Sequence, residues 1–131
     1  MNLGLDTSVV LRLLTGQPAD QALTTRRRLE QAHADGDRMV VSDTVLAESY
    51  HALVHHYRMD KDQARQVLLR MVTSGAVHAE PAEAVAALAP AAGAGLVDRL
   101  ILHRYRALSA STLTFDRALG AAGAVRLGSE A

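Results

Sequence analysis

The sequence predicts a single α/β domain built around a parallel sheet with helices on both faces. Short apolar or β-branched runs alternate with longer segments of helical periodicity, an order typical of parallel sheets. The 131 residues suit one compact domain, 1–131, and leave little room for a second. Hydrophobic residues make up 49% of the chain, which is enough for a core and argues against disorder.

Five short runs are predicted as strands of one sheet of about five strands. The run Met39-Val40-Val41 is apolar and β-branched, as expected of a buried strand. The run Ala76-Val77-His78 is weaker. The predicted strands cover 3–5, 39–41, 76–78, 111–114 and 124–127.

The helices between these strands are predicted from apolar spacing and from residues that begin or end helices. Asp6 is placed to cap the first helix, Ser42 or Asp43 the helix after the second strand, and Asp60 the next one. Strong periodicity covers 96–108, and one or two helical turns are expected in 115–119. The segment 86–95 is rich in Ala, Gly and Pro, and it is predicted as a loose helix followed by a loop.

The composition excludes several classes of protein. The chain has no cysteine, which excludes a disulfide framework, thiol catalysis and thiolate metal sites. Aromatic residues are 3% of the chain, too few for a base-stacking platform. No apolar run is long enough to span a bilayer, and the first residues do not resemble a signal peptide. We therefore expect a cytoplasmic protein with no membrane association.

The equal numbers of basic and acidic residues do not exclude an excess of basic residues outside a predicted acidic site. Basic and acidic residues number 14 each, and Lys61 is the only lysine. If four acids belong to one site, 14 basic residues remain against 10 acidic ones. A nucleic-acid partner is therefore compatible with a net charge of zero.

Four acidic residues stand near the predicted carboxyl ends of strands or in the helices that follow, each within apolar sequence. They are Asp6, Glu48, Asp98 and Asp116. Parallel α/β sheets place their sites at these strand ends. Because converging buried carboxylates would repel one another and raise at least one pKa, the pattern predicts a divalent cation with oxygen ligands. Each acid alone also has a structural explanation, as a helix cap, a turn residue or an arginine partner.

The sequences around these acids resemble the motifs of PIN-domain nucleases, and most closely the VapC toxins of bacterial toxin–antitoxin pairs. The segments that carry the resemblance are Leu5-Asp6-Thr7-Ser8, Leu46-Ala47-Glu48, Val97-Asp98-Arg99-Leu100-Ile101 and Leu113-Thr114-Phe115-Asp116-Arg117. The resemblance covers essentially the whole chain and depends on four acids in the right order. Arg99 and Leu100 depart from it, because small residues usually follow this acid.

The resemblance implies a three-layer α/β/α PIN-like domain and an endoribonuclease that depends on Mg²⁺ or Mn²⁺. It implies that Asp6, Glu48, Asp98 and Asp116 are catalytic metal ligands. It also gives Thr114 a supporting role, through a hydrogen bond to Asp6, Asp116 or the attacking water. The implied partners are an RNA substrate, a cognate VapB-type antitoxin and a second copy in a homodimer. The antitoxin would lie along apolar grooves of the toxin.

Other hypotheses remain open from the sequence. A catalytically inactive PIN-like module that binds RNA or protein would have the same fold. Glu48, His51 and His55 fall on one helical face and could serve a helical-bundle metalloprotein, although partly buried structural histidines are more common. Arginines close to the acids in sequence are candidates for RNA contacts. They are Arg99, Arg104, Arg106 and Arg117.

Overall fold

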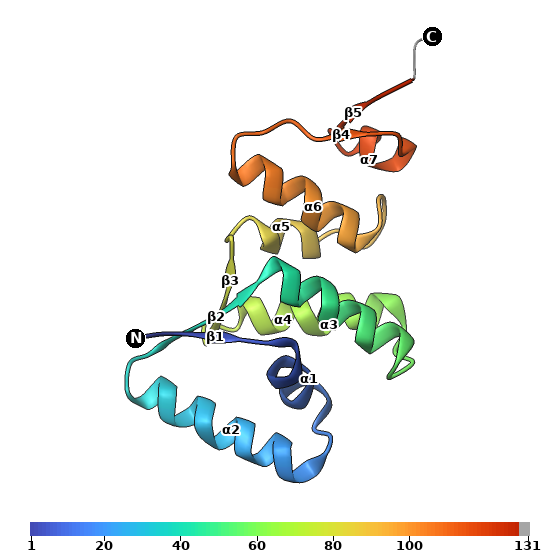
Figure 1. The fold of residues 1–131 in the computed structure, drawn as a ribbon. Helices are drawn as coiled ribbons and strands as arrows, with labels where there is room; N and C mark the ends of the chain where they lie inside the picture. The colour runs from blue at the N-terminus through green and yellow to red at the C-terminus, as the bar shows by residue number, and fades with distance from the viewer. Residues whose placement is uncertain (129–131) are drawn as a thin grey trace.

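The computed structural model describes residues 1–128, which form an α/β fold (Figure 1). The strands are β1 Asn2–Leu5, β2 Arg38–Ser42, β3 Val77–Glu80, β4 Leu113–Thr114 and β5 Val125–Arg126. The helices are α1 Thr7–Thr15, α2 Ala19–Ala34, α3 Asp43–His55, α4 Lys61–Thr73, α5 Ala84–Leu88, α6 Leu96–Ala107 and α7 Arg117–Ala121. No helix within this range combines the length and apolar character needed to cross a membrane.

The strands form two separate parallel sheets, not the single sheet of about five strands that the sequence predicts. β1, β2 and β3 pair in that order, with Leu3 beside Met39 and Val41 beside Ala79. β4 pairs with β5, its neighbour in sequence, and the backbone N–H of Val125 donates to a carbonyl just before β4 at 2.8 Å. β4 and β5 lie beyond α6, at the end of the molecule opposite α2 (Figure 1). We call β4, α7 and β5 the C-terminal module.

One face of the three-stranded sheet is well buried and the other is not. The chain steps from β1 to β2 to β3 in one direction, and crossovers of one hand then place α1–α4 on the same face. Most side chains that point to that face are buried, namely Leu5, Met39, Val41, Val77 and Ala79, and Leu3 is half-buried. On the opposite face Val40 and His78 are half-buried, and Gly4 is exposed. The prediction that helices cover both faces of the sheet is therefore confirmed only in part for residues 1–128.

The helix boundaries follow the predicted capping residues. Asp6 accepts from the Val9 N–H, Ser42 from Val45, and Asp60 from the two N–H groups that follow Lys61. Gly16 ends α1 in the left-handed conformation, with φ 71°, which costs glycine nothing sterically. The predicted loose segment becomes the short helix α5 and a loop that reaches Gly95.

The main core lies between the sheet and its helices. Leu46 and Leu53 of α3, Leu68 of α4 and Leu88 of α5 are completely buried in it. A second, much smaller cluster contains Ala94, Leu102 and Leu119, and it attaches the C-terminal module to α6.

Candidate functional site

Asp6 lies directly after β1, at the carboxyl end of the sheet. Its Oδ1 accepts from the Ser8 hydroxyl at 2.6 Å and from the Val9 N–H at 3.2 Å, so it caps α1. The hydrogen bond from Ser8, followed by that from Val9, lowers the pKa of Asp6 below its ordinary value. Asp6 is therefore not the acid whose pKa the predicted mutual repulsion raises.

Glu48 lies beside the start of α1, although it is 41 residues away from it in sequence. The Thr7 hydroxyl donates to Oε1 of Glu48 at 3.3 Å, and Thr7 directly follows Asp6. The structure thus brings two of the four predicted acids to the same edge of the sheet. Sequence reasoning did not assign this bridging contact to Thr7.

Asp98 lines a hollow between the start of α6 and α3. It is an exposed residue in the first turn of α6, where Gly95 rather than Asp98 holds the cap position. With His51 and His55 of α3, it lines this hollow of about 270 Å³. The two histidine rings lie 4.4 Å apart between centroids, and both side chains are exposed, not partly buried as expected. The helical-bundle hypothesis is wrong, because parallel strands carry this fold.

Asp116 lies in the C-terminal module, away from the three-stranded sheet (Figure 1). Its Oδ2 accepts from the Leu119 N–H at 2.7 Å and so caps α7. Thr114 accepts from the backbone N–H of Asp116 at 3.0 Å. Thr114 therefore supports the turn that carries Asp116, and this hydrogen bond uses the backbone and not the predicted carboxylate.

The comparison with known families decides the identity of the fold. The model of the PIN domain family matches residues 4–124, which include all four acids. The chain belongs to the PIN domain family. PIN domains are generally nucleases that use divalent metals, and the family suggests RNA or another nucleic acid as substrate. No curated protein matches the chain significantly.

The acids of this PIN domain do not form a complete metal site within one chain. All four carboxylates are exposed, whereas their apolar sequence neighbours suggested burial. Across residues 1–128, no three histidine, aspartate or glutamate side chains are grouped so that they could hold a metal ion. Asp6 and Glu48 have the oxygen donors that Mg²⁺ or Mn²⁺ prefers, but a stable site requires more ligands.

Two buried arginines hold the loop that leads into Asp98, and sequence reasoning missed both roles. Arg99 is 8% exposed and donates to the carbonyls of Ala87, Pro90 and Ala94. Arg65 is 9% exposed and donates to the carbonyls of Leu88 and Ala89. Burial, and then the charge of Arg65, lower the pKa of Arg99. Arg99 is therefore a structural residue of this PIN domain and not the predicted RNA contact.

The other predicted RNA contacts are more accessible than Arg99. Arg104, Arg106 and Arg117 are all exposed. Arg104 lies 3.8 Å from the carboxylate of Asp43, and Arg106 donates to the carbonyl of Ala122 at 3.0 Å. These positions leave cationic side chains along α6 and the C-terminal module.

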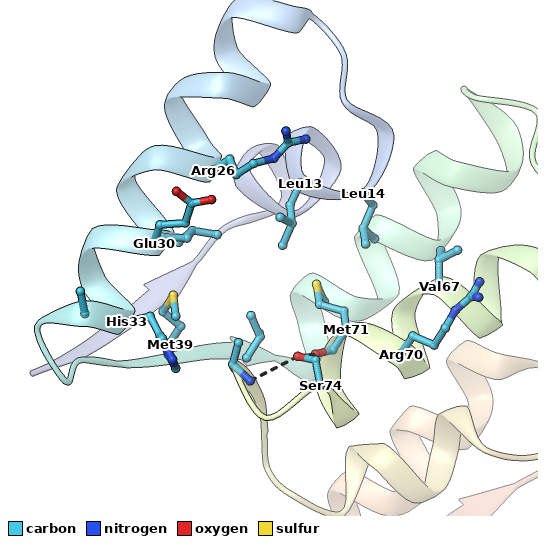
Figure 2. A pocket seen from close by; sticks show the side chains of 14 residues that line it. Leu13, Leu14, Arg26, Glu30, His33, Met39, Val67, Arg70, Met71 and Ser74 are labelled. Carbon is cyan, nitrogen blue, oxygen red and sulfur yellow. Dashed lines mark hydrogen bonds between the residues drawn. The ribbon is translucent and has the colours of Figure 1, made fainter.

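A large apolar groove of the PIN domain lies away from the acids. This groove of about 760 Å³ runs between the α1–α2 pair and α4 (Figure 2). Met39 and Val77, the buried residues near the amino ends of β2 and β3, form its floor, whereas Asp6 follows the carboxyl end of β1. Leu13, Leu14 and Leu29 make its wall apolar, and Arg26 and Glu30 lie at its rim. The shape suits a partner segment better than the reacting phosphate.

Proposed function

We propose that this PIN domain is an Mg²⁺- or Mn²⁺-dependent endoribonuclease that acts in the cytoplasm as the toxin of a type II toxin–antitoxin pair. The observation that carries the proposal is the position of Asp6 and Glu48. They come from distant parts of the sequence, and Thr7 joins them at the carboxyl end of the sheet. The family match over residues 4–124 supports nuclease chemistry at this edge.

In this proposal, Asp6, Glu48, Asp98 and Asp116 are the carboxylates that bind the divalent cation. When bound, the cation would acidify a water molecule and neutralise charge on the phosphoryl group. The residues of the chain have simpler tasks. The hydrogen bond from Ser8 keeps Asp6 ionised, and Thr7 orients Glu48.

RNA cleavage by the purified protein tests the proposal. We expect cleavage with Mg²⁺ or Mn²⁺, its loss with EDTA, and a loss of at least about 100-fold in Asp6→Asn or Asp116→Asn. Asparagine is as good a helix cap as aspartate, so both variants should remain folded. Asp35→Asn, at the exposed end of α2, is a matched control that should keep full activity. Undiminished cleavage by both site variants would contradict the proposal.

The second candidate function is an inactive PIN module that binds RNA or protein. The absence of a three-ligand cluster in the described part of the chain favours it. Calorimetric titration with Mn²⁺ separates the two candidates. A nuclease should bind Mn²⁺ and lose that binding in Asp6→Asn, whereas an inactive module should bind RNA equally with and without the cation.

The proposed antitoxin would place an apolar segment in the groove of Figure 2. Because this groove lies near the amino ends of β2 and β3, a different part of the antitoxin would extend the basic side chain that blocks the acids. The product of the adjacent upstream gene is the partner to test. Leu29→Glu puts a charge in the apolar wall and should abolish its co-purification. Arg28→Glu, on the exposed surface of the same helix, is the control and should leave it intact.

A further inference from the structure

Strands β1 and β4 each have an edge without a partner strand. Within residues 1–128, β1 pairs only with β2, and β4 pairs only with β5. The Met1 carbonyl accepts from the Arg38 N–H at 2.8 Å, so the alternation of the strand turns the backbone groups of Gly4 to the free side. Gly4 is exposed, and a Cβ built on it would meet no atom within 4 Å. Open edges of this kind readily pair with another strand.

The C-terminal module exposes the apolar side chains that such a pairing would cover. Leu113 is 64% exposed, Phe115 75% and Val125 49%. Helix α6 also carries four exposed apolar residues at helical spacing, and all four line a groove of about 430 Å³ against the start of α3. They are Val97, Ile101, Tyr105 and Leu108. Surfaces of this kind usually mark an interface.

We propose that the C-terminal module of one copy adds to the free edge of β1 in a second copy, and that reciprocal exchange gives a closed dimer. One register satisfies every feature of the two edges. Parallel pairing that sets Leu3 beside Leu113 also sets Leu5 beside Phe115. The same register brings Asp6 beside Asp116, because each acid directly follows its last apolar residue. Exchange of identical elements closes the assembly with twofold symmetry.

The contacts of the C-terminal module explain why β4 would pair with β1 of a second copy and not with β1 of its own chain. Leu102 of α6 and Leu119 of α7 are buried together in the small second cluster. The Arg106 guanidinium also donates to the Ala122 carbonyl at 3.0 Å. These contacts hold the module at the end of the molecule opposite α2 (Figure 1). Pairing with β1 of the same chain would break them, whereas pairing with a second copy keeps them.

The exchange supplies what the candidate site lacks. Asp6 and Glu48 come from one copy, and Asp116, which follows β4, comes from the other. This part rests on the proposed function, because it assigns Asp116 to the same metal-binding site as Asp6. The assembly itself depends only on the two open edges and the exposed apolar residues.

Cross-linking tests the assembly without any assay of activity. The chain has no cysteine, so Asn2→Cys and Ser111→Cys can be made in separate, differently tagged copies. After the two are unfolded and refolded together, a short thiol–thiol cross-linker should join them into a species with both tags. Arg28→Cys with Ser111→Cys is the control pair and should not be joined, because Arg28 lies on α2 and not on the β1 edge that is proposed to receive the module. Failure to join the test pair would overturn the proposal. A cross-link that forms only within one Asn2→Cys/Ser111→Cys chain would overturn it as well.

Complementation tests the shared site. Asp6→Asn and Asp116→Asn should each be inactive alone and regain about a quarter of wild-type activity when refolded together. Half of the dimers are then mixed, and one of the two sites in each has both aspartates. If the wild type is active and the copies cross-link, but the mixed variants do not regain activity, then Asp116 does not act in trans. If the wild type does not cleave RNA, the proposed function fails, and the cross-link still decides the exchange.

Discussion

The two parallel sheets of this protein differ in how they are stabilised. The sheet of β1, β2 and β3 contributes buried residues to the large core between it and the helices. The β4–β5 pair leaves Leu113, Phe115 and Val125 exposed, and the small cluster around Leu119, together with the Arg106–Ala122 hydrogen bond, attaches it to α6. A two-stranded sheet is marginal on its own in water. We therefore expect the first region to fold without the second, whereas the second needs a surface to pack on.

The largest effect that follows from this comparison concerns core truncation. Leu53→Ala opens a cavity in the fully buried main core, and it should lower the free energy of unfolding by about 2–5 kcal/mol. Leu119→Ala makes the same chemical change in the small cluster and should cost less, because neighbouring groups can relax into the space. Urea unfolding gives both values. Hydrogen exchange should show lost protection throughout the main core for Leu53→Ala, but only in 113–126 for Leu119→Ala. Equal losses in both variants would show that the two regions unfold as one unit.

An intermediate effect concerns the loop that joins the two regions. Arg99→Ala leaves the carbonyls of Ala87, Pro90 and Ala94 without their buried donor, so it should destabilise the protein by about 2–3 kcal/mol. Arg99→Lys should recover only part of this loss, because one ammonium group cannot reproduce the planar fork. Arg28→Ala, on the exposed surface of α2, should change stability by less than about 0.5 kcal/mol. Urea unfolding of the three variants checks the order. An effect of Arg99→Ala as small as that of Arg28→Ala would show that the loop is held by other contacts.

Local features of the first region were predictable from sequence. Asp6, Ser42 and Asp60 cap helices as expected, because a cap depends on a residue type and on the three residues that follow it. The apolar run at Met39-Val40-Val41 is the central strand, because a short apolar and β-branched segment between polar turns is typical of a buried strand. The order of the four acids was also sufficient to place the chain in its family.

The long-range features could not be predicted in the same way. The alternation of strands and helices does not say whether β4 joins β1 or remains with β5, since both arrangements are parallel. The burial of Arg65 and Arg99 depends on backbone carbonyls, which every sequence contains and which no residue type reveals. Arginine is also usually exposed, so composition pointed to the surface. The candidate site is therefore predictable as a set of residues but not as a geometry.

The smallest effect concerns pH and helix α6, which both regions contact. Burial lowers the pKa of His103 below its ordinary value of 6.5, and the charges of Arg106 and then Arg99 lower it further, while Glu83 opposes them weakly. Above pH 6.5 the imidazole is neutral in the folded and the unfolded chain, so it contributes no pH dependence. As the pH falls through 6.5, the unfolded chain binds the proton more readily, and the folded state loses stability until its own pKa is passed.

Replacement of His103 by glutamine should remove this loss. Between about pH 7.5 and pH 5.5, the melting temperature of the wild type should fall more steeply than that of His103→Gln, because only the wild type gains a proton at this position on unfolding. His33→Gln, at an exposed position on α2, is the matched control and should keep the slope of the wild type. Identical slopes for the wild type and His103→Gln would contradict the partial burial of this imidazole.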